Sequence, residues 1–203
     1  MKSLRPALIV ATLLLAGCAS NGSHSNASSW WNPLDWSWSA LWPGSWFGSS
    51  LTVTDQGVGA INDSTPLQEN ALKEGLNGDY RLRQGMRSEQ GSVVSFWQAL
   101  TDNEVKLTFS GKTTVNRIEV TDSDIASADG TRIGDAFSEH YQKAFGHCQA
   151  ASGETAPAVL CQAPDSQHVS YLYQGKWAGP QGLIPPDDVL KSWQVSKIIW
   201  HAE

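Results

Sequence analysis

Two spacings of hydrophobic residues organise the chain after residue 50. Apolar and polar side chains alternate over 80–85, 93–100, 105–109, 114–120, 168–173 and 195–200. A period of two is typical of strands that bury one face and expose the other. Asn103 and Ser110-Gly111 stand between consecutive strands, where short turns connect hairpins. The pattern therefore predicts an antiparallel sheet of hairpin-linked strands.

Helical spacing is confined to three short stretches. Thr65-Pro66-Leu67-Gln68 predicts a helix start, because a Thr N-cap, a Pro in the first turn and a Gln three residues after the Thr form a capping box. Asn77-Gly78 predicts the end of that helix. A second helix is expected over 135–146 and a third after Pro185-Pro186. Hairpin-linked strands with two or three short helices indicate an α+β domain.

The order of helix followed by strands occurs twice along the chain. Pro66-Leu67 opens the first series, and Asp135-Ala136-Phe137 opens the second about seventy residues later. The two halves share little sequence identity. Two helix–strand repeats are therefore a hypothesis at this stage.

Residues 1–17 have the features of an export signal. Lys2 and Arg5 precede an apolar stretch of about ten residues, too short to span a bilayer, which needs about 20. Leu15-Ala16-Gly17-Cys18 resembles the bacterial lipobox, after which Cys18 becomes the lipid-modified N-terminus. The alternative is an ordinary signal peptide followed by a chance cysteine. Ala19 differs from the Asp that resembles the inner-membrane retention signal, so the outer membrane is the expected destination.

Residues 18–50 are expected to be a tether, since Ser, Asn and Gly are frequent and Asp35 is the one charged residue. Six of the ten tryptophans of the protein nevertheless lie here: Trp30, Trp31, Trp36, Trp38, Trp42 and Trp46. Indole rings favour the membrane–water interface, which predicts a segment lying on the bilayer beside the lipid anchor. Packing onto the protein's own domain and binding of a partner are the two alternatives.

The composition of residues 51–203 is that of a single globular domain. The whole chain carries a formal charge of −6 and contains no run of basic residues, which argues against nucleic acid as a partner. Hydrophobic residues make up 40% of the chain, a share that excludes general disorder.

Cys148 and Cys161 remain as an even pair once Cys18 is assigned to lipid. The bacterial periplasm is oxidising, so a disulfide is expected between them. A zinc site is the sharper alternative, because His147 and His168 stand near these cysteines. Their spacing matches no zinc motif, and free thiols are the third possibility.

Catalytic signatures are sparse in this sequence. It has no G-x-S-x-G nucleophile elbow, no C-x-x-C pair and no phosphate-binding glycine loop. The acidic stretch from Asp122 to Gly130 does not fit the calcium-loop pattern and is expected to be a solvated turn. His147 and His168 remain as the candidate residues of a hydrolase acting on envelope components. We expect no metal and no cofactor.

Several short sequence motifs of the chain resemble those of a known protein family. They are Ser64-Thr65-Pro66-Leu67-Gln68-Glu69, Gly78-Asp79-Tyr80-Arg81-Leu82-Arg83, Asp122-Ser123-Asp124-Ile125, Lys143-Ala144-Phe145-Gly146-His147-Cys148, Ser166-Gln167-His168-Val169-Ser170-Tyr171 and the stretch 191–200. Together with the lipobox they resemble the enterobacterial sigma-E-regulated lipoprotein family, a domain of unknown function. The resemblance implies an outer-membrane lipoprotein made under envelope stress, and it assigns a role to Cys18 alone.

The sequence as a whole favours a non-enzymatic binding or scaffold domain. Cys18 is expected to hold this domain at the outer membrane, facing the periplasm. An envelope protein or cell-wall material is the expected partner. The alternative is the hydrolase near His147 and His168.

Overall fold

The computed structural model describes residues 51–89, 91–151, 157–180 and 182–202. These residues belong to one compact unit. The predicted signal peptide, Cys18 and the six tryptophans of the tether lie outside the described residues.

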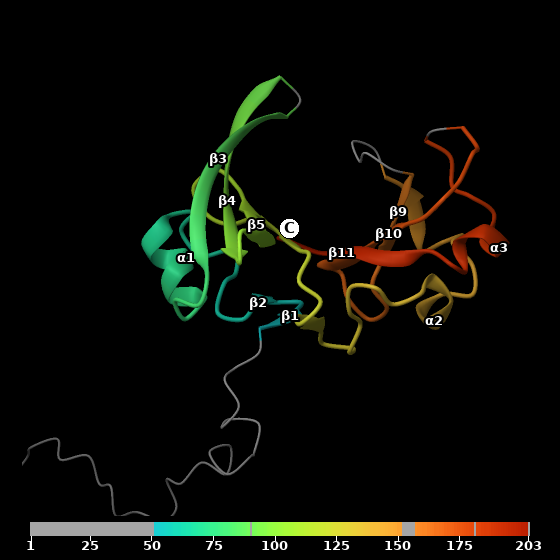
Figure 1. Cartoon of the computed structure of the whole chain (residues 1–203), viewed down its shortest axis with the longest axis horizontal. Helices are drawn as coiled ribbons and strands as arrows, with labels where there is room; N and C mark the ends of the chain where they lie inside the picture. Colours follow the sequence, from blue (N-terminus) through green and yellow to red (C-terminus); the bar gives the residue numbers. More distant parts are fainter. Residues whose placement is uncertain (1–50, 90, 152–156, 181, 203) are drawn as a thin grey trace, which may run out of the picture. The chain divides into compact units, whose positions relative to one another are not determined.

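An eight-stranded antiparallel sheet dominates the described part of the chain (Figure 1). Its strands follow one another in the order β3-β4-β5-β6-β11-β10-β9-β8. The bounds are β3 Arg81–Glu89, β4 Ser92–Thr101, β5 Glu104–Ser110, β6 Arg117–Val120, β8 Cys148–Ala150, β9 Ala158–Gln162, β10 Val169–Gln174 and β11 Gln194–His201. A three-stranded sheet, ordered β2-β1-β7, consists of β1 Thr52–Thr54, β2 Gly57–Val58 and β7 Ala126–Ser127.

The helices are α1 Glu69–Gly75, α2 Phe137–His140 and α3 Asp187–Leu190. The described domain is therefore β-rich, with less helix than the predicted α+β class suggests. The antiparallel sheet of hairpin-linked strands and the three short helices agree with the prediction. β8 and β9, which the sequence pattern did not indicate, extend the sheet at one edge.

The predicted helix start at Thr65 is wrong. α1 begins at Glu69, after Gln68, which makes no side-chain capping bond. Thr65 and Leu67 instead exchange backbone hydrogen bonds with the segment before β6: Leu67 N donates to Thr113 O and Val115 N donates to Thr65 O, both at 2.9 Å. Backbone groups paired in this way are not available to a helix.

The second helix is also shorter than expected, and the acidic turn is less solvated. α2 ends at His140, because Tyr141 adopts an extended conformation and is buried in the core. The segment from Asp122 to Gly130, expected to be a solvated turn, contains the short strand β7, and Asp122 and Ser127 are buried.

The two halves of the large sheet repeat one arrangement. Each half consists of a helix followed by four antiparallel strands, with α3 inserted between the third and fourth strands of the second half. The fourth strands, β6 and β11, pair at the centre. The segment before α2 pairs as Thr65–Leu67 does: Phe137 N donates to Trp193 O at 2.8 Å, and Val195 N donates to Asp135 O at 2.9 Å. The halves thus share their order of elements and the connection that ties each helix to its fourth strand.

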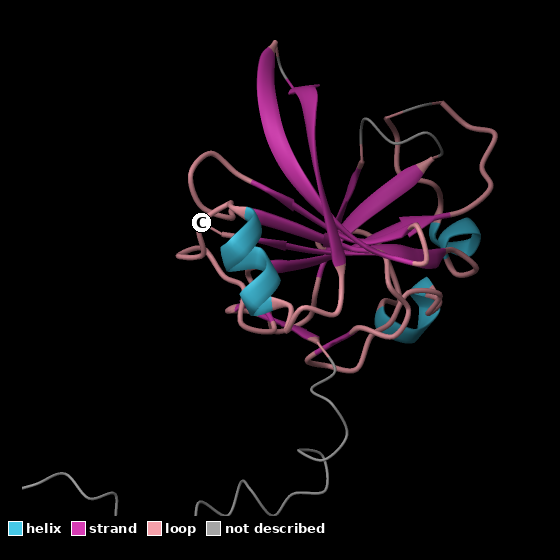
Figure 2. Cartoon of the chain, turned by 60° about the vertical axis from the view of Figure 1, so that its left-hand side comes forward, coloured by secondary structure: helices cyan, strands magenta, loops and turns pink. Residues whose placement is uncertain are grey.

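The main core lies on one face of the large sheet. α1, α2 and the small sheet lie on the same side of it (Figure 2). Leu107 of β5, Ile118 of β6, Ile198 of β11 and Tyr171 of β10 point into this core and are fully buried. Burial of these side chains is the main source of stability. The opposite face carries none of the three helices, and we call it the open face.

Candidate binding surface on the open face

Strand register decides which side chains share the open face. Thr108, Glu119, Ile199, Ser170 and Gln162 stand opposite one another on the neighbouring strands β5, β6, β11, β10 and β9. Directly opposed residues project to the same side of a sheet. They therefore form one continuous row across the open face.

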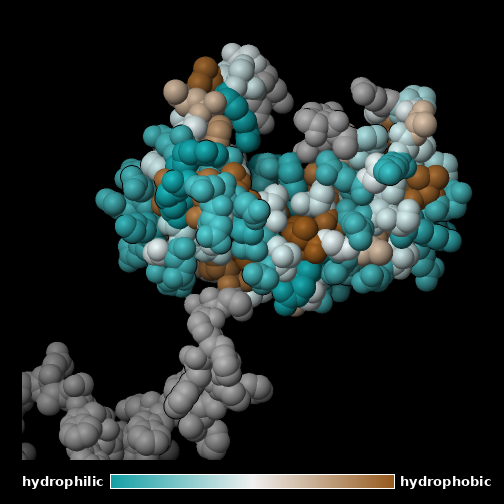
Figure 3. Space-filling model, in the orientation of Figure 1, coloured by the Kyte–Doolittle hydropathy of each residue, from teal (hydrophilic) through white to brown (hydrophobic). Residues whose placement is uncertain are grey.

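A groove of about 720 Å³ occupies the C-terminal half of this face. Leu160 and Ile199 contribute apolar surface to it, and Ile199 belongs to a small second cluster of buried residues with Leu172. Its polar lining includes Arg117, Gln149, Gln162, Gln167, Ser170 and His201. In Figure 3 the open face forms the upper margin of the domain, hollowed between the β3–β4 hairpin and the C-terminal half. Amides, hydroxyl and guanidinium groups bind polar ligands through directed hydrogen bonds.

Glu119 lies among cations near the centre of the open face. Arg117 Nε donates to Glu119 Oε1 at 3.0 Å, and Lys197 Nζ lies 3.5 Å from Glu119 Oε2. Burial by itself raises the pKa of Glu119, but the positive charges of Arg117, Lys197 and Arg87 outweigh burial and bring the pKa below its ordinary value. The carboxylate is therefore ionised at neutral pH, within a surplus of positive charge.

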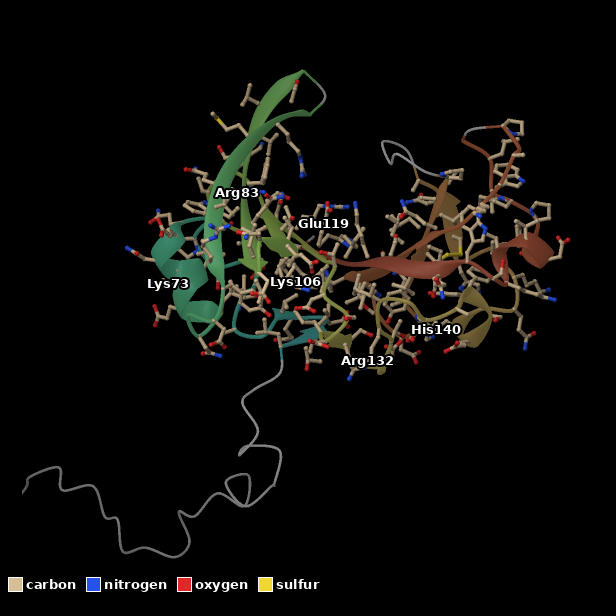
Figure 4. All side chains as sticks on the ribbon, viewed as in Figure 1. Lys73, Arg83, Lys106, Glu119, Arg132 and His140 are labelled. Atoms are coloured by element: carbon tan, nitrogen blue, oxygen red, sulfur yellow. A yellow bond between two sulfur atoms is a disulfide. The ribbon has the colours of Figure 1, made fainter. Side chains whose placement is uncertain are left out.

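Three further arginines lie along β3. The register places Arg83 opposite Gln98 and thus on the open face with Thr108 and Glu119. Arg83 donates to Gln98 Oε1 from Nη2 at 2.6 Å, and Arg81 donates from Nη2 to Asn103 Oδ1 at 2.8 Å. Figure 4 shows Arg83 and Glu119 away from Arg132 and His140, which lie on the side of α2.

Arg87 completes this series nearer the tip of the hairpin. Its guanidinium carbon lies 5.7 Å from the centre of the Phe96 ring, within the range of a cation–π contact. We call Arg81, Arg83, Arg87, Arg117 and Lys197 the basic half of the open face.

The disulfide between Cys148 and Cys161 is confirmed. The two residues face each other across β8 and β9, and Cys161 is buried in the core. This bond ties the edge strand β8, which contributes Gln149 to the groove, to β9. Because both sulfur atoms are used in the disulfide, they are not ligands of the zinc site considered as an alternative.

His147 and His168 do not share one set of contacts. His147 lines the groove, and its ring lies 5.7 Å from that of Tyr141. His168 Nδ1 lies 3.0 Å from the backbone oxygen of His201, with 6.2 Å between the two rings. Burial, followed by the neighbouring His168 and Arg117, lowers the pKa of His201. A neutral His201 therefore adds a hydrogen-bonding imidazole to the groove.

One group of side chains has the composition of a metal site. Ligand atoms of Asp135, Glu139 and His140 lie within 4.8 Å of one another. Both carboxylates, however, bind backbone at the start of α2: Arg132 N donates to Asp135 Oδ2 at 2.7 Å, and Ala136 N donates to Glu139 Oε1 at 3.4 Å. This local role accounts for their proximity.

Apart from His147 and Cys148, the sequence did not single out the residues of the open face. Arg81, Arg83 and Arg87 alternate with other residues on β3, as do Arg117 and Glu119 on β6. Such alternation marks the face of a strand that points away from the core. The polar residues at every second position of each predicted strand, considered together with the apolar ones, would have identified these side chains.

No helix within the described ranges is long and apolar enough to cross a membrane. The chain is 48% identical over 202 residues to the uncharacterized protein YfeY of Escherichia coli strain K12, covering 99% of this chain and all of that protein. The crystal structure of YfeY from Escherichia coli matches with a TM-score of 0.69 and 49% identity, over 74% of this chain and 99% of that one. Residues 35–202 match the family model described as protein of unknown function DUF1131. The chain therefore belongs to the DUF1131 family.

Proposed function

We propose that this protein is a lipid-anchored outer-membrane lipoprotein whose periplasmic domain is a non-enzymatic binding module. The observation that carries the binding role is the open face, where a groove of about 720 Å³ adjoins the basic half. The anchor at Cys18 rests on the lipobox-like sequence Leu15-Ala16-Gly17-Cys18. Confinement to a surface raises the effective concentration of the domain toward partners on that surface.

The entry point of the chain supports this arrangement. β1 follows Leu51 directly, and Val53 of β1 is part of the main core. The polypeptide thus joins the domain on the side opposite the open face (Figure 1).

The chemistry of the groove favours binding over catalysis. Three of its polar side chains are glutamine amides, which bind through hydrogen bonds and are poor nucleophiles and bases. Among the described residues that line it, no carboxylate stands beside His147 or His201 to complete an acid–base pair. The sequence resembles a stress-induced envelope lipoprotein family, and we infer that a module of this kind stabilises or recruits envelope components.

Site-specific photo-crosslinking in cells tests the binding role. A crosslinking amino acid at Gln149, in the groove, is expected to give discrete adducts, whereas one at Glu74, exposed on α1, is the control. Equal adduct patterns from both positions, or none from Gln149, would contradict a binding role of the groove.

The anchor is tested separately. Metabolic labelling with an alkyne fatty acid is expected to mark the wild-type protein in outer-membrane fractions, and Cys18→Ser should abolish both labelling and membrane association. Ser20→Ala is a matched control in the same segment. A Cys18→Ser protein that stays in the outer membrane would overturn the anchor. Induction by envelope stress is measured with a transcriptional reporter in strains with and without active sigma-E.

A further inference from the structure

The open face divides into two chemically different parts. The basic half places Arg81, Arg83 and Arg87 on β3, Arg117 on β6 and Lys197 on β11, beside the carboxylate of Glu119. The groove adds the amides of Gln149, Gln162 and Gln167 over β8, β9 and the loop before β10. We call these three residues the amide half.

Charge complementarity decides what the basic half binds. The protein as a whole is acidic, with a formal charge of −6, yet five of its cations gather on this face. The described partners of Arg81 and Arg83 are the neutral amides of Asn103 and Gln98. Guanidinium groups held by neutral partners keep their charge available for carboxylates, which they bind with two parallel hydrogen bonds.

The amide half favours an anionic ligand that also presents hydrogen-bond donors and acceptors. A glutamine side chain offers one acceptor and two donors, the same groups that an extended peptide backbone presents. Neighbouring strands are about 4.8 Å apart, so the eight strands span roughly 30 Å, the length of about ten extended residues. Figure 3 shows the domain hollowed between the β3–β4 hairpin and the C-terminal half, and an extended chain can lie along such a hollow.

From these observations we propose that the open face binds an extended, acidic peptide segment of a partner protein. The carboxylates of the segment pair with the basic half, and its backbone amides pair with the amide half. This inference rests on the proposed binding function and specifies the chemistry of its ligand.

The test uses the full-length protein, purified from membranes in neutral detergent. The probe is a fluorescent ten-residue peptide, with five aspartates followed by alternating glycine and serine, and a peptide with asparagine in place of aspartate is the neutral control. Fluorescence anisotropy is expected to show saturable binding of the acidic peptide only. Binding should weaken at 0.5 M salt, since screening shortens the range of charge interactions to about 4 Å.

Variants locate the contacts. Arg81→Gln with Arg83→Gln should weaken binding of the acidic peptide at least about fivefold. Lys73→Gln with Lys143→Gln removes the same charge from exposed positions elsewhere and should change affinity less than about twofold. Gln149→Ala with Gln167→Ala should weaken the ten-residue peptide but not a peptide of five aspartates alone. Thermal unfolding confirms that all variants are folded.

Each contrary result has a defined meaning. No saturable binding of the acidic peptide, or equal loss in the Lys73/Lys143 control, overturns the inference. Arginine-dependent binding of phosphatidylglycerol vesicles or oligogalacturonate without binding of the peptide overturns it also, since the ligand is then a lipid or a glycan. In these cases crosslinks from Gln149 would still support the proposed binding function, whereas their absence would remove that function as well.

Discussion

Arg117 and Glu119 face each other on the open face, two residues apart on β6, with a hydrogen bond of 3.0 Å from Arg117 Nε to Glu119 Oε1. Alternate residues of a strand project to the same side, which allows this pair to form within one strand. The pair holds a carboxylate, only 18% exposed, in the middle of the basic half. Glu119 therefore limits the repulsion among the cations that surround it.

Substitution Glu119→Gln is expected to lower the free energy of unfolding by about 1 kcal/mol at pH 7. The pKa of Glu119 is lower in the folded protein than in the unfolded chain, so its contribution is present above the unfolded pKa of about 4.3 and is lost as the pH falls through the folded pKa. The difference between variant and wild type should thus shrink as the pH falls below the unfolded pKa of about 4.3 and vanish once the pH lies below the folded pKa. Urea unfolding between pH 3 and 7 measures this dependence.

The control for Glu119 is Glu104→Gln. Glu104 is an exposed partner of Lys106 and its loss should change stability by less than about 0.5 kcal/mol at every pH. If Glu119→Gln behaved like this control, the electrostatic role assigned to Glu119 would be wrong.

Removal of the disulfide is expected to destabilise the edge of the sheet. Cys148 and Cys161 are 13 residues apart, and closing such a loop contributes about 3 kcal/mol in the chain-entropy model. The double variant Cys148→Ala/Cys161→Ala should therefore unfold at lower urea concentration than the oxidised protein. Reduction of the wild type with dithiothreitol should give a similar shift and leave the double variant unchanged. A shift of the double variant on reduction would point to a different covalent change.

Two glycines test the repeated arrangement of the halves. Gly111 follows β5 and Gly175 follows β10, the third strand of each half. A Cβ at Gly111 would lie 1.9 Å from the carbonyl oxygen of Thr114, and one at Gly175 would lie 2.3 Å from Cδ1 of Trp193. Replacement of either residue by alanine should lower the free energy of unfolding by about 3 kcal/mol, because the following connection must move.

Gly78→Ala is the control for these two variants. It has a φ of +78° but no atom within 4 Å of the added Cβ, so backbone strain alone should cost about 1 kcal/mol. Chemical denaturation of the three variants gives the comparison. Equal losses at all three sites would show that steric contact with the connections is not the cause.

The tyrosines make the stability of the folded protein depend on pH in the alkaline range. The protein has four, and burial raises the pKa of each: the pKa of Tyr171 is about 12, and those of Tyr80, Tyr141 and Tyr173 are also above the ordinary value of 10.0. The folded state therefore retains these protons longer than the unfolded chain, so stability falls as the pH rises above about 10. Absorbance at 295 nm should show no ionisation step near pH 10 in the native protein.

Ionisation should coincide with alkaline unfolding followed by circular dichroism. Denatured protein in urea is the reference and should titrate near pH 10. A step at pH 10 in the native protein would contradict the buried environment of these side chains.

Local patterns were sufficient for much of the fold. The alternation over 93–100 and 105–109 located β4 and β5, because a half-buried strand must place apolar residues at every second position. The pairing of Cys148 with Cys161 also followed from cysteine number and compartment. In contrast, Thr65 carries the local signal of a helix cap but pairs with the segment before β6. Long-range pairing replaced a local preference there.

The open face required tertiary structure. Arg83, Glu119 and Gln162 are far apart in sequence, and only the order of the strands and their register bring them into one surface. The alternation within one strand indicates which of its residues point away from the core. Which strands lie beside it is determined by contacts between distant segments of the chain. The residues themselves thus specified six of the eight strands of the large sheet, the disulfide and the expected address in the envelope. The folded chain decided that two series of helix and strands join at β6 and β11, and that none of the described helices lies on the cationic, amide-lined face.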